Sequence, residues 1–77
     1  MAVHYFHCTN GIDLVIDDKG QDSSTADEIS SHARLVAARL MRALPGYDEW
    51  SNWAVHVYDD FGALEIIDFP LERRRAA

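Results

Sequence analysis

Apolar residues recur every three or four positions between Ala26 and Leu44, the spacing at which side chains return to one side of an α-helix. At about 100° per residue they fill an arc of roughly 140°, which suits packing on a sheet rather than a coiled-coil seam. Residues 24–44 are therefore predicted to contain the helix around which the rest of the chain is organised. Its apolar positions are Ala26, Ile29, Ala33, Val36, Ala37, Leu40, Met41 and Leu44.

Both ends of this helix carry sequence signals. Thr25 and Glu28 fit a capping box, in which each side chain accepts a backbone N–H that the helix leaves without a partner. Pro45 and Gly46 stop the helix at its other end. Leu35 breaks the pattern, because it projects from the polar arc. We expect it to be a lone exposed leucine covered by arginine stems, and the alternative is a contact with a partner.

Residues 3–8 and 12–16 are rich in β-branched and aromatic residues and flank Thr9-Asn10-Gly11, which predicts a hairpin. A two-residue turn would pair Thr9 with Ile12, whereas a three-residue loop would pair Cys8 with Ile12. We favour the three-residue loop. It gathers on the inner face Phe6, Cys8, Ile12, Leu14 and Ile16, and it leaves outside Tyr5, His7, Asp13 and Val15.

A second hairpin is predicted from residues 53–58 and 63–69, joined by a turn at residues 59–62, with Trp53 as a core anchor. Its register stays open. A four-residue loop would put Leu64 and Ile66 on the Trp53 face. A three-residue loop would put Ile67 and Phe69 there instead.

The predicted fold class is α+β, a ββαββ chain in which a four-stranded, mainly antiparallel sheet carries the amphipathic helix on one face. Whichever apolar set is left over joins Tyr58 on the opposite face, and a contiguous apolar patch usually marks an interface. We expect a homodimer formed through sheet faces or edges. The candidate interface residues are Tyr5, His7, His56 and Tyr58. Residues 1–72 are predicted to form a single domain and residues 73–77 a basic mobile tail.

Composition narrows the possible functions. A chain of 77 residues forms one small domain with little room for a large enclosed active site. The net charge of −6 argues against nucleic-acid binding, which relies on clustered lysine and arginine, and the run from Arg73 to Arg75 is taken as solvated. We find no membrane-spanning apolar run, no signal peptide and only one cysteine, Cys8, which together predict a cytoplasmic location.

The histidines, the cysteine and the carboxylates do not have the spacing of a known site. His4 and His7 point to opposite faces of an extended strand, and zinc requires about four converging ligands. His7 and His56 converge on the outer face only if the first and third predicted strands are neighbours. We expect His7 and His56 to be ordinary surface histidines, the Cys8 thiol to be buried, and the protein to have no metal, no cofactor and no enzymatic activity.

The order of short motifs along nearly the whole chain resembles domain of unknown function 6894, a family of small bacterial proteins. The motifs are His4-Tyr5-Phe6-His7, Gly11, Asp17-Asp18-Lys19-Gly20, the Ala-rich helix, Trp53-Ala54-Val55, Val57-Tyr58-Asp59-Asp60-Phe61-Gly62 and Phe69-Pro70. The resemblance implies a cytoplasmic bacterial protein of this fold but no activity, because the family has none established. The chain departs from the family in Asp22-Ser23-Ser24, where a more apolar Leu-Pro-Asp type of segment is typical.

A looser likeness, limited to Thr25-Ala26-Asp27-Glu28, links the chain to HicB-type antitoxins and is a fold-level analogy. Three hypotheses follow. The first is a non-enzymatic module that self-associates and binds another protein through the candidate interface. The second is an antitoxin-like regulatory component, and the third is a small-molecule or metal-binding protein that uses His7 and His56.

Overall fold

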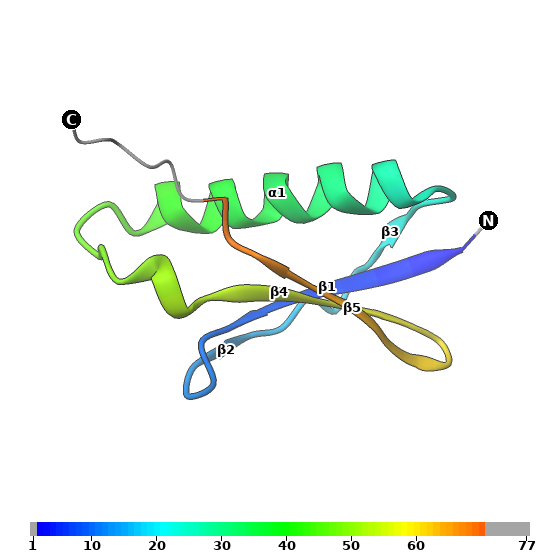
Figure 1. Cartoon of the computed structure of the whole chain (residues 1–77), viewed down its shortest axis with the longest axis horizontal. Coiled ribbons are helices and arrows are strands. Elements are labelled where there is room, and N and C mark those ends of the chain that lie inside the picture. The colour runs from blue at the N-terminus through cyan, green and yellow to red at the C-terminus, as the bar shows by residue number, and fades with distance from the viewer. Residues whose placement is uncertain (1, 71–77) are drawn as a thin grey trace.

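The computed structural model describes residues 2–70. One helix lies across one face of an antiparallel sheet, and no described element covers the other face (Figure 1). This confirms the predicted α+β class. The elements are β1 (Val3–Thr9), β2 (Leu14–Val15), β3 (Gln21–Asp22), α1 (Ala26–Ala43), the 3₁₀ turn η1 (Trp50–Asn52), β4 (Ala54–Asp59) and β5 (Gly62–Asp68).

The central strand β1 pairs with β4, in the strand order β2-β1-β4-β5. The short strand β3, which the sequence pattern did not predict, pairs with the first residues of β1, while β2 pairs with its last residues. All of these pairings are antiparallel. The first and third predicted strands, β1 and β4, are therefore neighbours, although their paired positions Tyr5 and Tyr58 lie 53 residues apart in the sequence.

The helix begins where its sequence signals predicted. Thr25 is the N-cap, and its hydroxyl accepts the Glu28 N–H at 3.1 Å while the Glu28 carboxylate accepts the Thr25 N–H at 3.3 Å. The last helical residue is Ala43, directly before Leu44 and the predicted stop at Pro45. Among the described residues, no helix has the length and apolarity needed to cross a membrane.

The first hairpin has a longer loop than predicted. Cys8 pairs with Val15 and Thr9 with Leu14, so four residues separate the strands. Asn10 favours this loop, because its Oδ1 accepts the N–H groups two and three residues further on, at 2.9 and 2.7 Å. Val15, predicted to lie outside, therefore stands on the same side of the sheet as Cys8.

The predicted inner face of this hairpin is wrong for three of its five residues. Ile12, Leu14 and Ile16 are 89%, 56% and 62% exposed, whereas Phe6 and Cys8 are buried. A register change of one residue moves alternate side chains to the opposite face. The paired part of β2 also ends after two residues, so little of this segment reaches the core.

The second hairpin adopts the register of the shorter predicted loop by a different route. β4 and β5 meet in a two-residue turn at residues 60–61, and a bulge in β5 then shifts the register between Val57 and Tyr58. The extra residue has the same effect on the following side chains as a longer loop. It puts Ile67 and Phe69 on the Trp53 face, the second of the two predicted arrangements.

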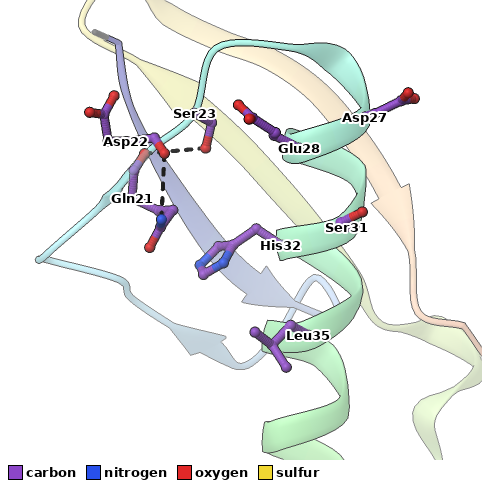
Figure 2. Close-up of a pocket in the computed structure, with 8 residues that line it drawn as sticks. All are labelled: Gln21, Asp22, Ser23, Asp27, Glu28, Ser31, His32 and Leu35. Atoms are coloured by element: carbon purple, nitrogen blue, oxygen red, sulfur yellow. Dashed lines mark hydrogen bonds between the residues drawn. The ribbon is translucent and has the colours of Figure 1, made fainter.

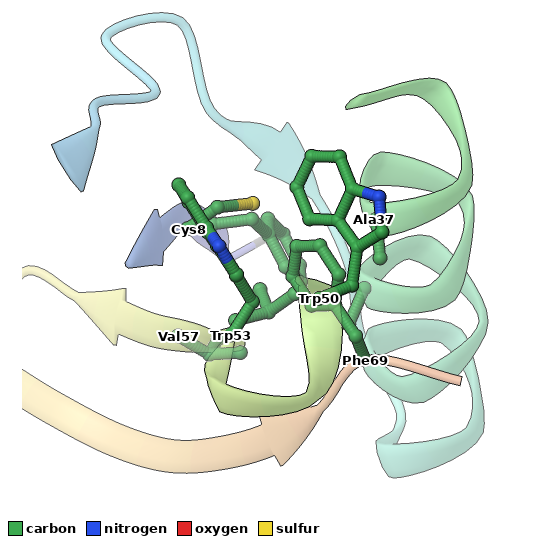
Figure 3. Close-up of a cluster of buried hydrophobic side chains, with 9 residues drawn as sticks. Cys8, Ala37, Trp50, Trp53, Val57 and Phe69 are labelled. Atoms are coloured by element: carbon green, nitrogen blue, oxygen red, sulfur yellow. The ribbon is translucent and has the colours of Figure 1, made fainter. Parts of the chain in front are cut away.

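The core lies between α1 and the inner face of the sheet (Figure 3). Ala33 and Ala37 are completely buried, and their small side chains let the helix approach the strands closely. Each strand of the β1–β4 pair contributes alternate residues. The buried set consists of Phe6, Cys8, Ala33, Ala37, Trp50, Trp53, Val55, Val57 and Phe69.

Aromatic rings close one end of this core. The ring centroids of Trp50 and Trp53 lie 5.6 and 5.8 Å from that of Phe69. Tyr47 accepts both indole N–H groups, that of Trp50 with its carbonyl at 3.0 Å and that of Trp53 with its hydroxyl at 3.2 Å. Trp53 is confirmed as a core anchor, and the equally buried Trp50 joins it from η1.

Candidate functional site

The four candidate interface residues lie together on the outer face of the sheet. Tyr5 pairs with Tyr58 and His7 with His56, so they form two adjacent cross-strand pairs on β1 and β4. The His7 and Tyr58 rings lie diagonally, with centroids 5.1 Å apart. All four side chains are partly exposed, because the sheet supports them from one side and α1 covers only the other.

β5 extends this face. Ile66 pairs with His56 and is 64% exposed, so an apolar side chain borders the histidines. Asp68 pairs with Ala54 at one end of the face and brings a carboxylate to its margin. The centre of the outer face is therefore aromatic and apolar, with its charge at the edge.

His7 also binds the connection between β2 and β3. The backbone N–H of Asp17 donates to Nδ1 of His7 at 3.0 Å. A ring nitrogen that accepts a hydrogen bond carries no proton, so in the neutral ring the proton lies on Nε2. Nε2 is then a donor with no free lone pair, whereas a metal ligand needs one. This geometry disfavours His7 as a metal ligand.

The Asp17 carboxylate fills a gap along β1 between β2 and β3. Its Oδ2 accepts the Phe6 N–H at 3.1 Å, and its Oδ1 accepts the N–H groups of Lys19 and Gly20 at 3.0 and 3.1 Å. Partial burial raises the pKa of the Asp17 carboxyl, but these three N–H groups and nearby His7 lower it more, so the pKa lies below 3.8. The sequence analysis predicted only a turn here.

A groove of about 430 Å³ lies between β3 and α1 (Figure 2). The carboxylate of Glu28 is engaged in helix capping, and the His32 ring packs edge-on against Phe6 at a centroid distance of 4.7 Å. Leu35, predicted to be exposed, is 42% exposed at the edge of this groove. Much of the polar lining is thus used in local structure. The lining residues are Gln21, Asp22, Ser23, Asp27, Glu28, Ser31, His32 and Leu35.

The remaining histidine and cysteine point into the protein. Cys8 is buried as predicted, and burial, with a smaller effect of the Asp17 charge, raises the pKa of its thiol to about 11. A protonated and inaccessible thiol is a poor nucleophile. His4 is also buried, and its Nδ1 has no hydrogen-bond partner among the described residues. Within residues 2–70, no three or more His, Cys, Asp or Glu side chains are grouped to hold a metal ion.

Comparison with known proteins agrees with the order of motifs in the sequence. Neither the curated proteins nor the solved structures contain a match to this chain. The model of one family, described as a domain of unknown function (DUF6894), matches residues 3–69. This match spans β1 to the end of β5 and includes both the outer face and the Asp17 connection. The chain therefore belongs to the DUF6894 family.

Proposed function

We propose that this protein is a non-enzymatic interaction module that forms a homodimer through the outer face of its sheet. The observation that carries the proposal is the cross-strand block of Tyr5, His7, His56 and Tyr58 on a face that α1 leaves uncovered. Tyrosine is enriched in protein interfaces, because its ring buries apolar area while its hydroxyl keeps a hydrogen-bond partner. A contiguous partly apolar face of this kind usually marks a contact site.

Charge supports a second copy as the occupant. Each chain carries a net charge of −6, so two copies repel each other except where their facing surfaces lack carboxylates. The centre of the outer face meets this condition, because its tyrosine and histidine rings and Ile66 bring no carboxylate. Two acidic copies can approach here with the least repulsion.

The arrangement is also self-complementary. A two-fold axis in the contact plane and across the strands would place the tyrosine pair of one copy over the histidine pair of the other. His7 presents an Nε2–H donor, and a tyrosine hydroxyl accepts hydrogen bonds. The same patch thus supplies both partners of each contact, as an isologous dimer requires.

The proposed location is the bacterial cytoplasm, where a single unpaired Cys8 suits the reducing conditions. The antitoxin-like alternative receives no separate support. Its shared residues, Thr25-Ala26-Asp27-Glu28, are accounted for by the capping box at the start of α1.

The test is the oligomeric state of Tyr58→Asp, measured by size-exclusion chromatography with light scattering. We expect a dimeric wild-type protein and a monomeric variant with an unchanged circular dichroism spectrum, because the new carboxylate would be desolvated in the contact. Ser31→Asp, on the exposed side of α1, adds the same charge away from the sheet and should remain dimeric. A monomeric wild-type protein, or a variant that dimerises like the wild type, would overturn the proposal.

A further inference from the structure

His7 joins two parts of the molecule through one titratable ring. Its ring lies on the outer face, opposite His56 and 5.1 Å from the Tyr58 ring. Its Nδ1 accepts the backbone N–H of Asp17 in the connection between β2 and β3. A change in the protonation of His7 therefore acts on the candidate interface and on this connection at once.

The connection is held to β1 mainly through Asp17. β2 pairs with β1 only at Cys8 and Thr9, and β3 pairs only at Val3 and His4. Between these short ladders, the Asp17 N–H bonds to His7 and the Asp17 carboxylate bonds to the Phe6 N–H. Loss of the first bond removes half of the polar contacts that Asp17 makes to β1.

Protonation of His7 is incompatible with the bond it now accepts. The imidazolium ion carries an N–H on both ring nitrogens, so Nδ1 would present a proton to the Asp17 N–H at 3.0 Å. Two donors facing each other at this distance repel. The bond from Asp17 is lost when the ring gains its second proton.

The surroundings decide what replaces the lost bond. The ring faces His56 and Tyr58 on β4, Tyr5 on its own strand, and Asp17 in the connection. Of these groups, Asp17 alone is a carboxylate. Its carboxylate would attract the imidazolium ion and leave the N–H groups of Phe6, Lys19 and Gly20 that it accepts now.

We propose that His7 is a proton-operated latch: uptake of a proton at Nδ1 detaches the Asp17 backbone from β1 and shifts residues 16–20. Acid supplies this proton, so acidification opens the latch. The link to dimerisation rests on the proposed function above. There, each protonated His7 would place a desolvated charge in the contact, and acidification favours the monomer.

The latch is tested by nuclear magnetic resonance on ¹⁵N-labelled full-length protein between pH 7.5 and 5.0. Ring nitrogen shifts should report the Nε2–H tautomer of His7 at pH 7.5. The Asp17 amide shift should follow the same midpoint as the His7 ring, and its exchange protection factor should fall about tenfold as the ring is protonated. An Nδ1–H tautomer of His7 at pH 7.5 would overturn the latch. An Asp17 amide shift that stays constant while the His7 ring is protonated would also overturn it.

Two variants distinguish the effect of His7 on the Asp17 amide from any effect of His32. His7→Phe cannot accept the Asp17 N–H, so its Asp17 amide should be unprotected at every pH. His32→Gln removes a second ring that the Asp17 charge affects. Burial and the Arg39 charge lower the pKa of His32, whereas the Asp17 charge raises it. It should leave the pH response of the Asp17 amide unchanged. A response that disappears in His32→Gln would assign the effect to His32 and overturn the proposal.

Sedimentation measurements at pH 7.5 and 5.5 then test the regulatory link. A dimer at pH 7.5 that weakens at least tenfold at pH 5.5, with no such weakening in His7→Phe, would support it. If the dimer were unaffected by pH while the Asp17 amide still responded to pH, the proposed pH regulation of dimerisation would be overturned. A chain that is monomeric at both pH values would overturn the proposed function, and the amide titration would still decide the latch.

Discussion

A Cβ atom on Gly20 would lie 2.6 Å from Cγ1 of Val3, closer than two carbon atoms approach unless one of them shifts. Gly20 also has φ of +79°, in the left-handed region that side chains disfavour. The absence of a side chain thus lets the connection between β2 and β3 lie directly on β1. The Asp17 turn depends on this approach, because Asp17 accepts the Gly20 N–H.

Gly20→Ala should lower the free energy of unfolding by about 2 kcal/mol, since it adds a steric clash to an unfavourable φ. Urea denaturation followed by tryptophan fluorescence measures the change. Gly46→Ala is the matched control, because within residues 2–70 no atom beyond its chain neighbours lies within 4 Å of its added Cβ, and it should stay within about 0.5 kcal/mol of the wild type. Equal stability of the two variants would contradict the close packing of Gly20 on Val3.

Acid should weaken the Asp17 contacts. The N–H groups around the carboxylate outweigh the effect of its burial and hold the pKa of Asp17 below 3.8 in the folded protein. The unfolded chain therefore binds the proton first, and the stability that Asp17 contributes is present above about pH 4 and lost as the pH falls through the lower folded value. Asp17→Asn cannot show this loss.

The measurement is urea denaturation of the wild type and Asp17→Asn at pH 6 and at pH 3. The wild type should be more stable at pH 6, by about 1 to 3 kcal/mol, because the neutral amide is a weaker acceptor and turns a donor toward the Phe6 N–H. The difference should shrink at pH 3. A difference that is the same at both pH values would show that the charge of Asp17 does not contribute.

Alkali should remove the stability that the protonated Cys8 thiol contributes. Burial and the Asp17 charge raise the pKa of the Cys8 thiol from 9.0 to about 11 in the folded protein. The unfolded chain loses this proton first as the pH rises, so the stability contributed by the protonated thiol is present below pH 9 and lost between about pH 9 and 11. The wild type should lose more stability than Cys8→Ala over this interval.

Thiol chemistry checks the same environment independently. Iodoacetamide should label Cys8 of the folded protein at pH 8 at least about tenfold more slowly than in urea, because labelling requires an accessible thiolate. Rapid labelling of the folded protein would contradict the burial of this thiol.

Phe69 and Ile66 test the register of the second hairpin. Phe69 is 5% exposed and packs against two tryptophan rings, so Phe69→Ala should cost about 3 to 5 kcal/mol of unfolding free energy. Ile66 is 64% exposed, and Ile66→Ala should cost less than about 1 kcal/mol. Thermal denaturation compares the two. A larger effect of Ile66→Ala would support the opposite register.

The sequence by itself determined the helix and its start. The capping box of Thr25 and Glu28 joins residues three positions apart, and every bond within α1 joins near neighbours. The apolar arc likewise predicted the burial of Ala33 and Ala37, because the helical period alone sets which side chains share a face. It also predicted that Leu35 would stay exposed.

Only the tertiary structure decided how the strands align. Asn10 lengthened one loop and a bulge after the turn at residues 60–61 shifted the other hairpin, and each change of one residue reverses which side chains face the helix. The cross-strand pair of His7 and His56 required β1 to pair with β4, although α1 lies between these strands in the sequence. The bond from Asp17 to His7 likewise needed a turn whose path no local pattern specifies. The Asp17 backbone binds a residue ten positions earlier, and its side chain binds one eleven positions earlier.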